Sequence, residues 1–444
     1  MKRSCQYVSW GRYPKLPPTT ETYRYYWTDQ PLPATTHTLL PYGNGRSYGD
    51  CCLNGEEALI DMRPLDRFLS FNPETGILRC EAGTLLADIL STVVPHGWFL
   101  PVTPGTRFVT VGGAIANDVH GKNHHRTGTF GSHVRNLVLR RSDLGIVQCS
   151  QTENQQLFHA TIAGLGLTGL ILRAEIQLRP ITNPGIHVET IRFPNLDGFF
   201  DLSIESDRDY EYTVAWIDCL ARGRSLGRGH FIRGNHATPP EKLPPSPGKT
   251  WSFPVELPFP LINTWSLKAF NSLYYRKQLV QARHTFIHYE PFFYPLDGIR
   301  YWNRIYGRQG FLQYQCAVPT ASAQESIRVL LEAIASAGKG SFLSVLKVFG
   351  NRPSPGMLSF PRPGVTLALD FPNEGQPTLD LLDQLDLIVA GAGGAVYPAK
   401  DARMSANHFQ EYFPRWKEFE SLMDPRFSSS FWRRVARATS CATS

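Results

Sequence analysis

Short runs of hydrophobic residues, separated by turn-forming residues, mark most of the chain. Between residues 35 and 183 these runs predict strands at Ala58–Met62, Ile77–Ala82 and Leu170–Leu178. A helical spacing of apolar positions predicts amphipathic helices at Leu85–Val94 and Asn154–Ile162. Because strands and helices alternate here without a repeat period, we predict an α+β fold.

The pattern changes after residue 184, where a stretch rich in proline and aromatic residues precedes a second series of elements. We expect strands at Gly310–Pro319, Ser341–Phe349 and Val365–Phe371 and helices at Ala321–Ala337 and Thr378–Ala390. The residues after 394 are too few to form a core of their own. We therefore predict two domains, 1–183 and 184–394, followed by a segment, 395–444, that returns to the first domain.

Composition narrows the class of protein. The 444 residues are 42% hydrophobic and 19% charged, which excludes disorder as the dominant state. We find no apolar run of the ~18–20 residues needed to cross a bilayer and no secretory signal, so we expect a cytoplasmic location. The eight cysteines form no CxxC pair, which predicts reduced thiols and no structural zinc. The net charge of +7 is dispersed, which favours an anionic small ligand or a phospholipid surface over nucleic acid.

The segment Pro239–Phe270 combines apolar side chains with basic flanks. Its apolar members are Trp251, Phe253, Val255, Leu257, Phe259, Leu261, Ile262, Trp265 and Phe270. Its basic flanks are Arg222, Arg224, Arg228 and Arg233 before it and Lys268, Arg276 and Lys277 towards and beyond its end. Aromatic rings beside Lys and Arg suit a membrane interface. Proline-interrupted apolar loops also commonly cover part of their own domain, so the sequence leaves both interpretations open.

Two glycine-rich runs carry candidate chemistry. The run from Pro41 to Asp50 has three glycines within seven residues, which predicts either a phosphate-binding loop or a plain turn. The run from Pro104 to His125 places small residues before several polar ones, and this pattern favours a cradle for a flat cofactor over a surface turn. The four-residue spacing of His120 and His124 suits a metal pair only superficially, because Gly121 and Asn123 weaken the helix that would carry the two histidines. We therefore predict no metal.

A third run, Gly164-Leu-Gly-Leu-Thr-Gly169, matches the G-x-G-x-x-G fingerprint of dinucleotide-binding folds. That fingerprint works only with a strand before it and a helix after it. Here a predicted helix precedes the glycines and a predicted strand follows them, so we reject a nicotinamide dinucleotide site. The glycines suit a tight turn from helix to strand.

Taken in order, these runs resemble the flavoproteins of the vanillyl-alcohol-oxidase and p-cresol-methylhydroxylase (VAO/PCMH) type. Within that family the likeness is strongest to the flavin subunits of decaprenylphosphoryl-ribose 2′-epimerases, which are lipid-linked sugar oxidases. The motifs that carry the likeness are Gly45–Asp50, Pro104–His125, Gly131–Arg135, Leu157–Gly169, Ala215–Asp218, Trp302–Arg304, Gly310–Gln315, Lys347–Gly350, Asp370–Pro372 and Ala399–Arg403. The resemblance implies a two-domain fold, with an FAD-binding domain and a substrate domain built on an antiparallel sheet with flanking helices.

The resemblance also implies the site residues. FAD would contact Tyr42, Gly43, Asn44, Gly45, Arg46, Ser47, Tyr48, Gly49, Gly105, Thr110, Val111, Gly112, Gly113, Asn117, His120, Ile171 and Tyr397. The substrate would contact Tyr48, Trp216, Gln313, Gln315, Lys347 and Lys400, and the catalytic residues would be Lys400 and His120. In related carbohydrate oxidases a histidine of the first loop is bonded to the flavin, whereas this chain has Arg46 there. We therefore expect FAD to be held non-covalently.

Three positions depart from the mycobacterial members. Ala368 replaces a pocket cysteine, Thr366 a nearby asparagine and Phe293 a tyrosine at the pocket edge. The expected reaction is the oxidation of a secondary hydroxyl of a polyprenylphosphate-linked pentose to a keto-sugar, with a separate NAD(P)H-dependent short-chain reductase completing a 2′-epimerisation from ribose to arabinose. The alternatives are a soluble aldose or aldonolactone oxidase that uses oxygen, and a basic lipid- or nucleic-acid-binding protein with a vestigial flavin fold.

Overall fold

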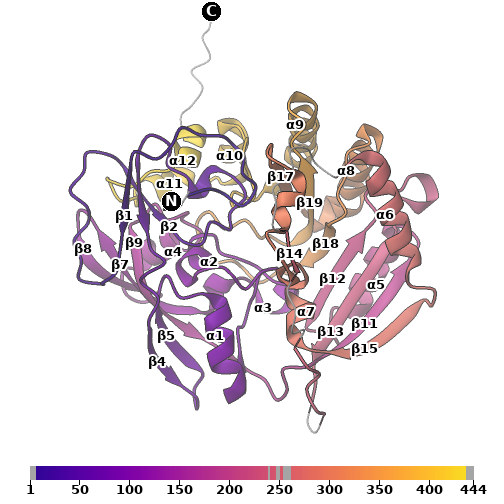
Figure 1. The fold of residues 1–444 in the computed structure, drawn as a ribbon, viewed down its shortest axis with the longest axis horizontal. Coiled ribbons are helices and arrows are strands. Elements are labelled where there is room, and N and C mark those ends of the chain that lie inside the picture. The colour runs from indigo at the N-terminus through magenta and orange to yellow at the C-terminus, as the bar shows by residue number, and fades with distance from the viewer. Residues whose placement is uncertain (1–6, 239–240, 247–250, 254–261, 437–444) are drawn as a thin grey trace, which may run out of the picture.

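The computed structural model describes residues 7–238, 241–246, 251–253 and 262–436, and their strands gather in two regions (Figure 1). The first region holds the N-terminal part of the chain, and the second holds most of the chain after residue 185. The fold is α+β, as predicted from the sequence.

The N-terminal region is built on two main sheets. A parallel sheet has the order β1 (Glu21–Arg24), β3 (Ala58–Asp61), β2 (Leu39–Tyr42). An antiparallel sheet has the order β4 (Phe68–Asn72), β5 (Ile77–Glu81), β9 (Leu170–Gln177), β7 (Val134–Arg141), β8 (Gly145–Ser150), and β6 (Trp98–Phe99) pairs separately with β10 (Arg179–Pro180). The helices of this region are α1 (Leu86–Val93), α2 (Val111–Ala116), α3 (His124–Thr127) and α4 (Gln155–Thr161).

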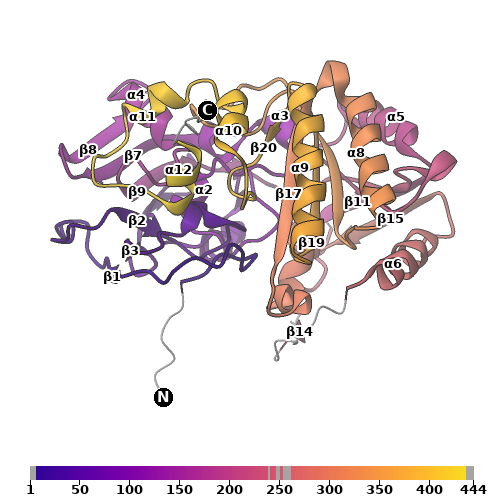
Figure 2. The ribbon, with the colours of Figure 1, turned by 90° about the horizontal axis from the view of Figure 1, so that it is seen from above.

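The second region is one large sheet in which all neighbouring strands are antiparallel. Its order is β15 (Ala282–Ile287), β11 (Ile186–Phe193), β13 (Gly229–His236), β12 (Tyr212–Ile217), β18 (Ser344–Phe349), β19 (Gly364–Pro372), β17 (Phe311–Pro319), β20 (Ala395–Val396). One face is covered by α5 (Leu196–Ser206), α8 (Ala323–Ala337) and α9 (Gln376–Gly391) (Figure 2). The other elements here are α6 (Thr264–Arg276), α7 (Tyr289–Phe293) and the short parallel pair β14 (Trp251–Ser252) and β16 (Ile299–Arg300).

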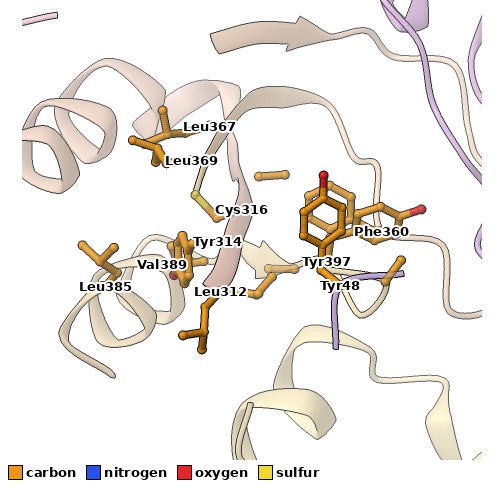
Figure 3. Packing of buried hydrophobic residues seen from close by; sticks show 14 of the residues in the cluster. Tyr48, Leu312, Tyr314, Cys316, Phe360, Leu367, Leu369, Leu385, Val389 and Tyr397 are labelled. Atoms are coloured by element: carbon orange, nitrogen blue, oxygen red, sulfur yellow. The ribbon is translucent and has the colours of Figure 1, made fainter. Parts of the chain in front are cut away.

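Alternation along β17 decides which residues reach the functional side of this sheet. Leu312, Tyr314 and Cys316 are buried and face the helices, together with Leu385 and Val389 of α9 (Figure 3). Because successive side chains of a strand point to opposite faces, the intervening residues of β17 point to the uncovered face. The polar residues of the sheet are therefore set apart from its apolar core.

The tail of the chain joins the two regions. Ala395 and Val396, the first residues of the predicted C-terminal segment, pair with β17 as the last strand of the large sheet. The chain then continues through α10 (Ala406–Tyr412), α11 (Trp416–Glu420) and α12 (Ser430–Val435), which lie over the N-terminal region (Figure 1). The guanidinium of Arg434 pairs there with Asp50 at 2.7 Å and with Asp401 at 2.9 Å.

The elements expected from periodicity are all present, and some of their boundaries differ. The predicted strand Ser341–Phe349, which is β18, begins at Ser344, because the hydroxyl of Ser341 bonds to the backbone of Leu343 and the chain bends there. Helix α8 begins at Ala323, after a 3₁₀ turn at Thr320–Ser322. Within the described ranges, no helix combines the length and the apolar character that a membrane span requires.

Candidate active site

A cavity of about 560 Å³ lies where the two regions meet. Its walls come from the loop after β2, from the segment 103–122, from the uncovered face of β17, β18 and β19, and from the tail at residues 397–400. Segments far apart in the sequence therefore share one space, whose volume lies within the range of small-molecule and cofactor sites.

Backbone hydrogen bonds hold the loop 43–48 at its two ends, whereas the amide groups between them donate to no protein acceptor among the described residues. The amide of Met62 donates to the carbonyl of Tyr42 at 2.9 Å, and the amide of Tyr48 donates to the carbonyl of Ala399 at 2.9 Å. Among the described residues, the amide groups of 43–47 donate no hydrogen bond to another protein group. A row of free N–H groups beside a cavity suits the pyrophosphate of a dinucleotide.

Glycine is required in this loop for close packing. Gly45 has a φ of +59°, and a Cβ at Gly43 would lie 2.5 Å from the hydroxyl of Thr110. Gly49 serves a different purpose, because a Cβ there would lie 1.6 Å from the carbonyl oxygen of Asp401 in the tail. The last glycine of the first motif thus lets the tail dock and does not itself line the cavity.

The second glycine-rich run forms the adjoining wall. Thr110 caps the N-terminus of α2, and its hydroxyl accepts a hydrogen bond from the amide of Gly113 at 3.1 Å. Gly112 donates to the carbonyl of Ala82 at 2.8 Å, and a Cβ there would approach the Ala82 methyl to 3.1 Å. Gly105 has open space where a Cβ would stand. The run therefore presents main chain to the cavity, as a flat ring system lying against it would need.

Asn117 and Arg46 each bring a buried polar group without a protein partner to this wall. The side-chain oxygen of Asn117 and the Nε of Arg46 are buried and make no hydrogen bond in the described part of the chain. The guanidinium of Arg46 stacks 4.1 Å above the Trp10 ring, and burial lowers its pKa although nearby Asp297 opposes the shift. Both groups line the cavity and are placed to bind a polar ligand.

His120 connects this wall to the large sheet. The side-chain amide of Gln315 donates to its Nε2 at 2.9 Å, so the ring proton sits on Nδ1, which is buried without a partner. Burial, reinforced by the charge of Lys347, holds the pKa of His120 well below its usual range. His120 is therefore neutral. Within the described residues, no group of three His, Cys, Asp or Glu side chains could hold a metal ion.

The uncovered face of the large sheet carries the predicted substrate residues. Gln313 and Gln315 of β17 and Lys347 of β18 all line the cavity. Gln313 donates from Nε2 to Oδ1 of Asp370 at 2.6 Å, and these two residues are opposite each other in the β17–β19 ladder. The polar partner of Gln313 is thus a carboxylate on the next strand, whereas Gln315 donates to His120 and Thr366.

Trp216 stands apart from the other predicted substrate residues. It lies opposite Val345 in the β12–β18 ladder, on the cavity face, but the ring of Tyr274 covers it at 4.5 Å. Its indole N–H donates to the carbonyl of Phe342 at 2.9 Å, and the residue does not line the cavity. In the structure Trp216 packs α6 against the sheet.

Lys400 enters the cavity from the tail. Its Nζ lies 3.7 Å from the centre of the Tyr48 ring, and its amide is fixed by the carbonyl of Tyr397 at 2.9 Å. Burial lowers the pKa of Lys400, and the charge of Asp370 opposes that shift. Burial likewise raises the pKa of Asp370, whose Oδ2 has no partner among the described residues. The two groups form an electrostatically coupled pair.

The structure brings most of the predicted site residues to this one cavity. Those that line it are Gly43, Asn44, Gly45, Arg46, Ser47, Tyr48, Gly105, Thr110, Gly112, Gly113, Asn117, His120, Ile171, Gln313, Gln315, Lys347, Tyr397 and Lys400. Those that do not are Tyr42, Gly49, Val111 and Trp216. The hydroxyl of Tyr42 donates to the carbonyl of Val8 at 2.8 Å, and Val111 is fully buried in the core behind the wall.

Four charged residues at or beside the cavity were not predicted. Lys122, Asp297 and Arg300 line it, and Asp370 bonds to the lining residue Gln313. Lys122 stands inside the polar run Pro104–His125, and Asp370 begins the Asp-Phe-Pro motif. Both positions could therefore have been recognised in the sequence as candidate site residues. Ala368 and Phe293, two of the positions that depart from the mycobacterial pattern, also line the cavity, and the hydroxyl of Thr366 accepts from Gln315 at 3.2 Å.

Comparison with known proteins agrees with this geometry. Residues 32–150, which include both glycine-rich runs, match the FAD binding domain family. The chain is 37% identical over 421 residues to decaprenylphosphoryl-beta-D-ribose oxidase of Mycolicibacterium smegmatis, with 89% of each chain covered. It is 34% identical over 372 residues to an uncharacterised protein of Streptomyces coelicolor, covering 79% of this chain and 99% of that one. L-gulonolactone oxidase of Mus musculus is 33% identical over 141 residues, 31% of each chain.

The free amide groups of the first loop and the exposed main chain of the second fit an FAD, and the unpartnered groups of Arg46 and Asn117 add polar contacts for it. The similarity to the mycobacterial oxidase extends beyond this cofactor half through nearly the whole chain. The protein is therefore an FAD-dependent oxidoreductase and belongs to the VAO/PCMH family of flavoproteins, in the group of decaprenylphosphoryl-β-D-ribose oxidase.

Proposed function

We propose that this enzyme oxidises a secondary hydroxyl, at C2′ of a ribose carried on a polyprenyl phosphate, to a ketone. The observation that carries the proposal is the convergence of Lys400, Gln313, Gln315 and Lys347 on the cavity that the two glycine-rich loops also line. Amide side chains and an ammonium bind sugar hydroxyls and a phosphate, respectively. The 37% identity to an oxidase of decaprenylphosphoryl-ribose supports the same substrate class.

We assign a separate role to each of the three segments of the chain. Residues 1–183 hold FAD, residues 184–394 hold the sugar, and residues 395–444 return to close the cofactor site. FAD, when bound, supplies the acceptor for the hydride that leaves the carbon of the alcohol. No histidine stands in the first loop where a covalent flavin link would form, so the chain holds FAD through non-covalent contacts alone.

Lys400 is the residue we assign to charge stabilisation. Its ammonium is held at a buried position above the Tyr48 ring, where a fixed positive charge has a large effect on charge that develops during reaction. Asp370 acts on Lys400 at a distance, since its carboxylate raises the pKa of the lysine against the effect of burial. Gln313 orients that carboxylate by donating to Oδ1.

His120 has a different part. Gln315 donates to its Nε2, and the proton therefore occupies Nδ1, so neither nitrogen offers a free lone pair to the hydroxyl of the substrate. We assign His120 to positioning Gln315 and the sugar. Since Lys400 acts here as an ammonium, the hydroxyl proton passes to a water molecule bound with the substrate.

The substrate and product imply two partners. A polyprenyl chain stays in a bilayer, so we propose that the enzyme works in the cytoplasm at the inner membrane. The exposed side chains Trp251, Trp265 and Leu273, which are 78%, 83% and 71% accessible, are the apolar contacts that such a surface requires. The keto-sugar would be reduced by a separate NAD(P)H-dependent short-chain reductase to complete the epimerisation.

The test is substrate-driven reduction of the flavin. Holoenzyme without oxygen is mixed with a short-chain prenylphosphoryl-ribose, with free ribose and with an aldonolactone, and the loss of flavin absorbance is followed. We expect rapid bleaching with the phosphoribosyl lipid alone. Bleaching by the free sugar or the lactone, without bleaching by the lipid-linked sugar, would replace the proposal with a soluble aldose or aldonolactone oxidase.

A further inference from the structure

Two lysines of the cavity wall have no acidic partner. The Nζ of Lys122 donates to the carbonyl of Phe293 at 3.2 Å, and the Nζ of Lys347 donates to the carbonyl of Gly121 at 3.2 Å. Both side chains are largely withdrawn from solvent and both line the cavity. In the described part of the chain neither ammonium forms an ion pair, whereas Lys400 has Asp370 as a coupled neighbour.

Burying these two ammonium groups is unfavourable in free energy. An ammonium has three N–H donors, and one carbonyl satisfies one of them. The rings of Phe292 and Phe349 lie 5.5 Å from the ammonium groups of Lys122 and Lys347, respectively, and compensate part of the buried charge. The two lysines also repel each other, and this repulsion adds to burial in lowering the pKa of Lys347. Two unpaired cations kept at such a position call for an anionic ligand.

Their position relative to the other groups suits the substrate. Lys347 lies on β18, and its register partner on β19 is Thr366, whose hydroxyl accepts from the Gln315 amide. Lys122 follows His120 and Gly121 in the chain. The two ammonium groups therefore reach the cavity from two different segments that meet at Gly121, and they lie with the glutamines that we assign to the sugar in its lining.

We propose that Lys122 and Lys347 form a subsite for the phosphate ester of the substrate. The inference rests on the proposed function, because it takes the sugar to be carried on a phosphate. A prenyl phosphodiester brings one negative charge and two non-bridging oxygens, one for each ammonium, and charge-assisted hydrogen bonds of this kind are strong. A free aldose offers no such anion and leaves both cations uncompensated. The pair therefore selects lipid-linked phosphosugars over free sugars.

The test compares Lys122→Met and Lys347→Met with the wild-type holoenzyme. Methionine keeps much of the apolar length of lysine and removes its charge, and an unchanged flavin spectrum verifies the fold. Lys347→Arg retains the charge, and Lys417→Met removes the same charge from an exposed position on α11. Binding of geranyl phosphate and of inorganic phosphate is measured by titration calorimetry, and flavin reduction by prenylphosphoryl-ribose is measured in parallel.

We expect each Met variant to bind geranyl phosphate roughly 10- to 100-fold more weakly, and to show a KM for the phosphosugar raised to a similar degree with kcat little changed. Lys347→Arg and Lys417→Met should bind nearly as the wild type does. Unchanged binding and KM in both Met variants would overturn the subsite. Equal affinity of the wild type for inorganic and geranyl phosphate would overturn its assignment to a prenyl phosphate ester.

The two proposals fail in different ways. If the wild type oxidises prenylphosphoryl-ribose and the Met variants retain its KM, the phosphate subsite is wrong and the proposed function stands. If the wild type binds geranyl phosphate through these lysines and oxidises no ribose substrate, the subsite stands and the proposed function is wrong.

Discussion

The Nζ of Lys400 lies 3.7 Å from the centre of the Tyr48 ring, which joins the tail of the chain to the first glycine-rich loop. The backbone strengthens this junction, because the amide of Tyr48 donates to the carbonyl of Ala399 at 2.9 Å. Gly49 and the carbonyl of Asp401, each one residue further along its segment, also lie close together and extend this junction. The cation that we assign to catalysis is therefore positioned by the same loop that we assign to FAD.

Replacing Lys400 by alanine should leave the fold and FAD binding intact and slow flavin reduction by about 10²–10³-fold. The reason is that a preorganised cation acts mainly on charge that develops in the transition state. Anaerobic stopped-flow measurement of flavin bleaching checks this, with Lys417→Ala as the control for an exposed lysine. An unchanged bleaching rate in Lys400→Ala would remove this lysine from the mechanism.

The pH dependence of flavin reduction should report on the pair formed by Lys400 and Asp370. Because reduction requires the ammonium form, the rate falls as pH rises through the pKa of Lys400, which burial places below that of an ordinary lysine. The carboxylate of Asp370 raises that pKa, so Asp370→Asn should move the alkaline fall of the rate to lower pH. Asp380→Asn, at an exposed position of α9, should leave the profile unchanged. A fall that stays in place or moves to higher pH in Asp370→Asn contradicts the coupling.

FAD should leave the protein on denaturation. The first loop offers Arg46, which stacks on Trp10, and no histidine to form a link to the flavin. Acid precipitation followed by centrifugation should leave the yellow colour in the supernatant, and the released cofactor should run as free FAD in chromatography. Colour retained in the pellet would show a covalent bond and refute this prediction.

Periodicity was sufficient to predict the six strands and four helices that it marked, because these elements have strong apolar faces, but it did not mark strands such as β11, β12 and β13. Alternation also placed Gln313 and Gln315 on the opposite face of β17 from Leu312 and Tyr314. The pairing of β20 with β17 could not be predicted, since two short apolar residues carry no signal of their neighbour. The apolar residues Val255, Leu257, Phe259 and Leu261 of the predicted membrane segment lie outside the described residues, so that part of the prediction has no structural counterpart.

For the site, too, the sequence predicted residues and did not predict their contacts. Composition and spacing indicated glycine-rich walls, but they could not tell that Gly49 approaches the tail while Gly105 faces open space. Trp216 was predicted to contact substrate, and only the three-dimensional packing shows that Tyr274 covers it. The importance of Asp370 depends on Lys400 being its neighbour, and these residues come from different segments. A sequence motif identifies candidate site residues, whereas the contacts that these residues make with distant segments depend on the fold.

The ion pairs of Arg434 should control how firmly the tail closes the site. Its carboxylate partners, Asp50 and Asp401, each have a side chain only 3% exposed. Arg434→Met would leave two buried carboxylates without their cation, which typically costs about 3–5 kcal/mol in the free energy of unfolding. Since Asp401 is next to Lys400, the variant should also lose FAD more readily. Urea denaturation of the holoprotein and its flavin content provide the two measurements.

Arg415→Met is the matched control for that variant. Arg415 pairs with Glu418 three residues along the chain at α11, and the two side chains are 51% and 46% exposed. An exposed pair of this kind contributes about 0–1 kcal/mol, so the control should unfold nearly as the wild type does. Equal destabilisation by the two substitutions would show that burial of the Arg434 pairs has no special effect.

Contact with a membrane should depend on an apolar surface formed by β14 and α6, which lie toward the same edge of the molecule in Figure 2. We define this surface by Trp251, Trp265 and Leu273, which are exposed by 78%, 83% and 71%. The exposed basic residues Lys268, Arg276 and Lys277 belong to α6 or follow it. Each basic residue near an anionic bilayer adds about 1 kcal/mol of attraction, so binding should weaken as salt screens these charges.

Vesicles that contain anionic phospholipid should therefore pellet the wild-type protein at low salt, and a variant with serine at Trp251, Trp265 and Leu273 should remain largely in solution with its FAD. The matched control replaces Leu144, in the turn before β8, and Ile146, at the start of β8, by serine; their side chains are 60% and 55% exposed. Apolar side chains hold a protein at a membrane interface through the area that they bury in it. Only the substitutions on the contacting face should therefore reduce pelleting. Equal loss of pelleting in both variants would mean that general surface hydrophobicity causes the binding. A wild type that ignores anionic vesicles but oxidises a free aldose would favour the soluble sugar oxidase instead.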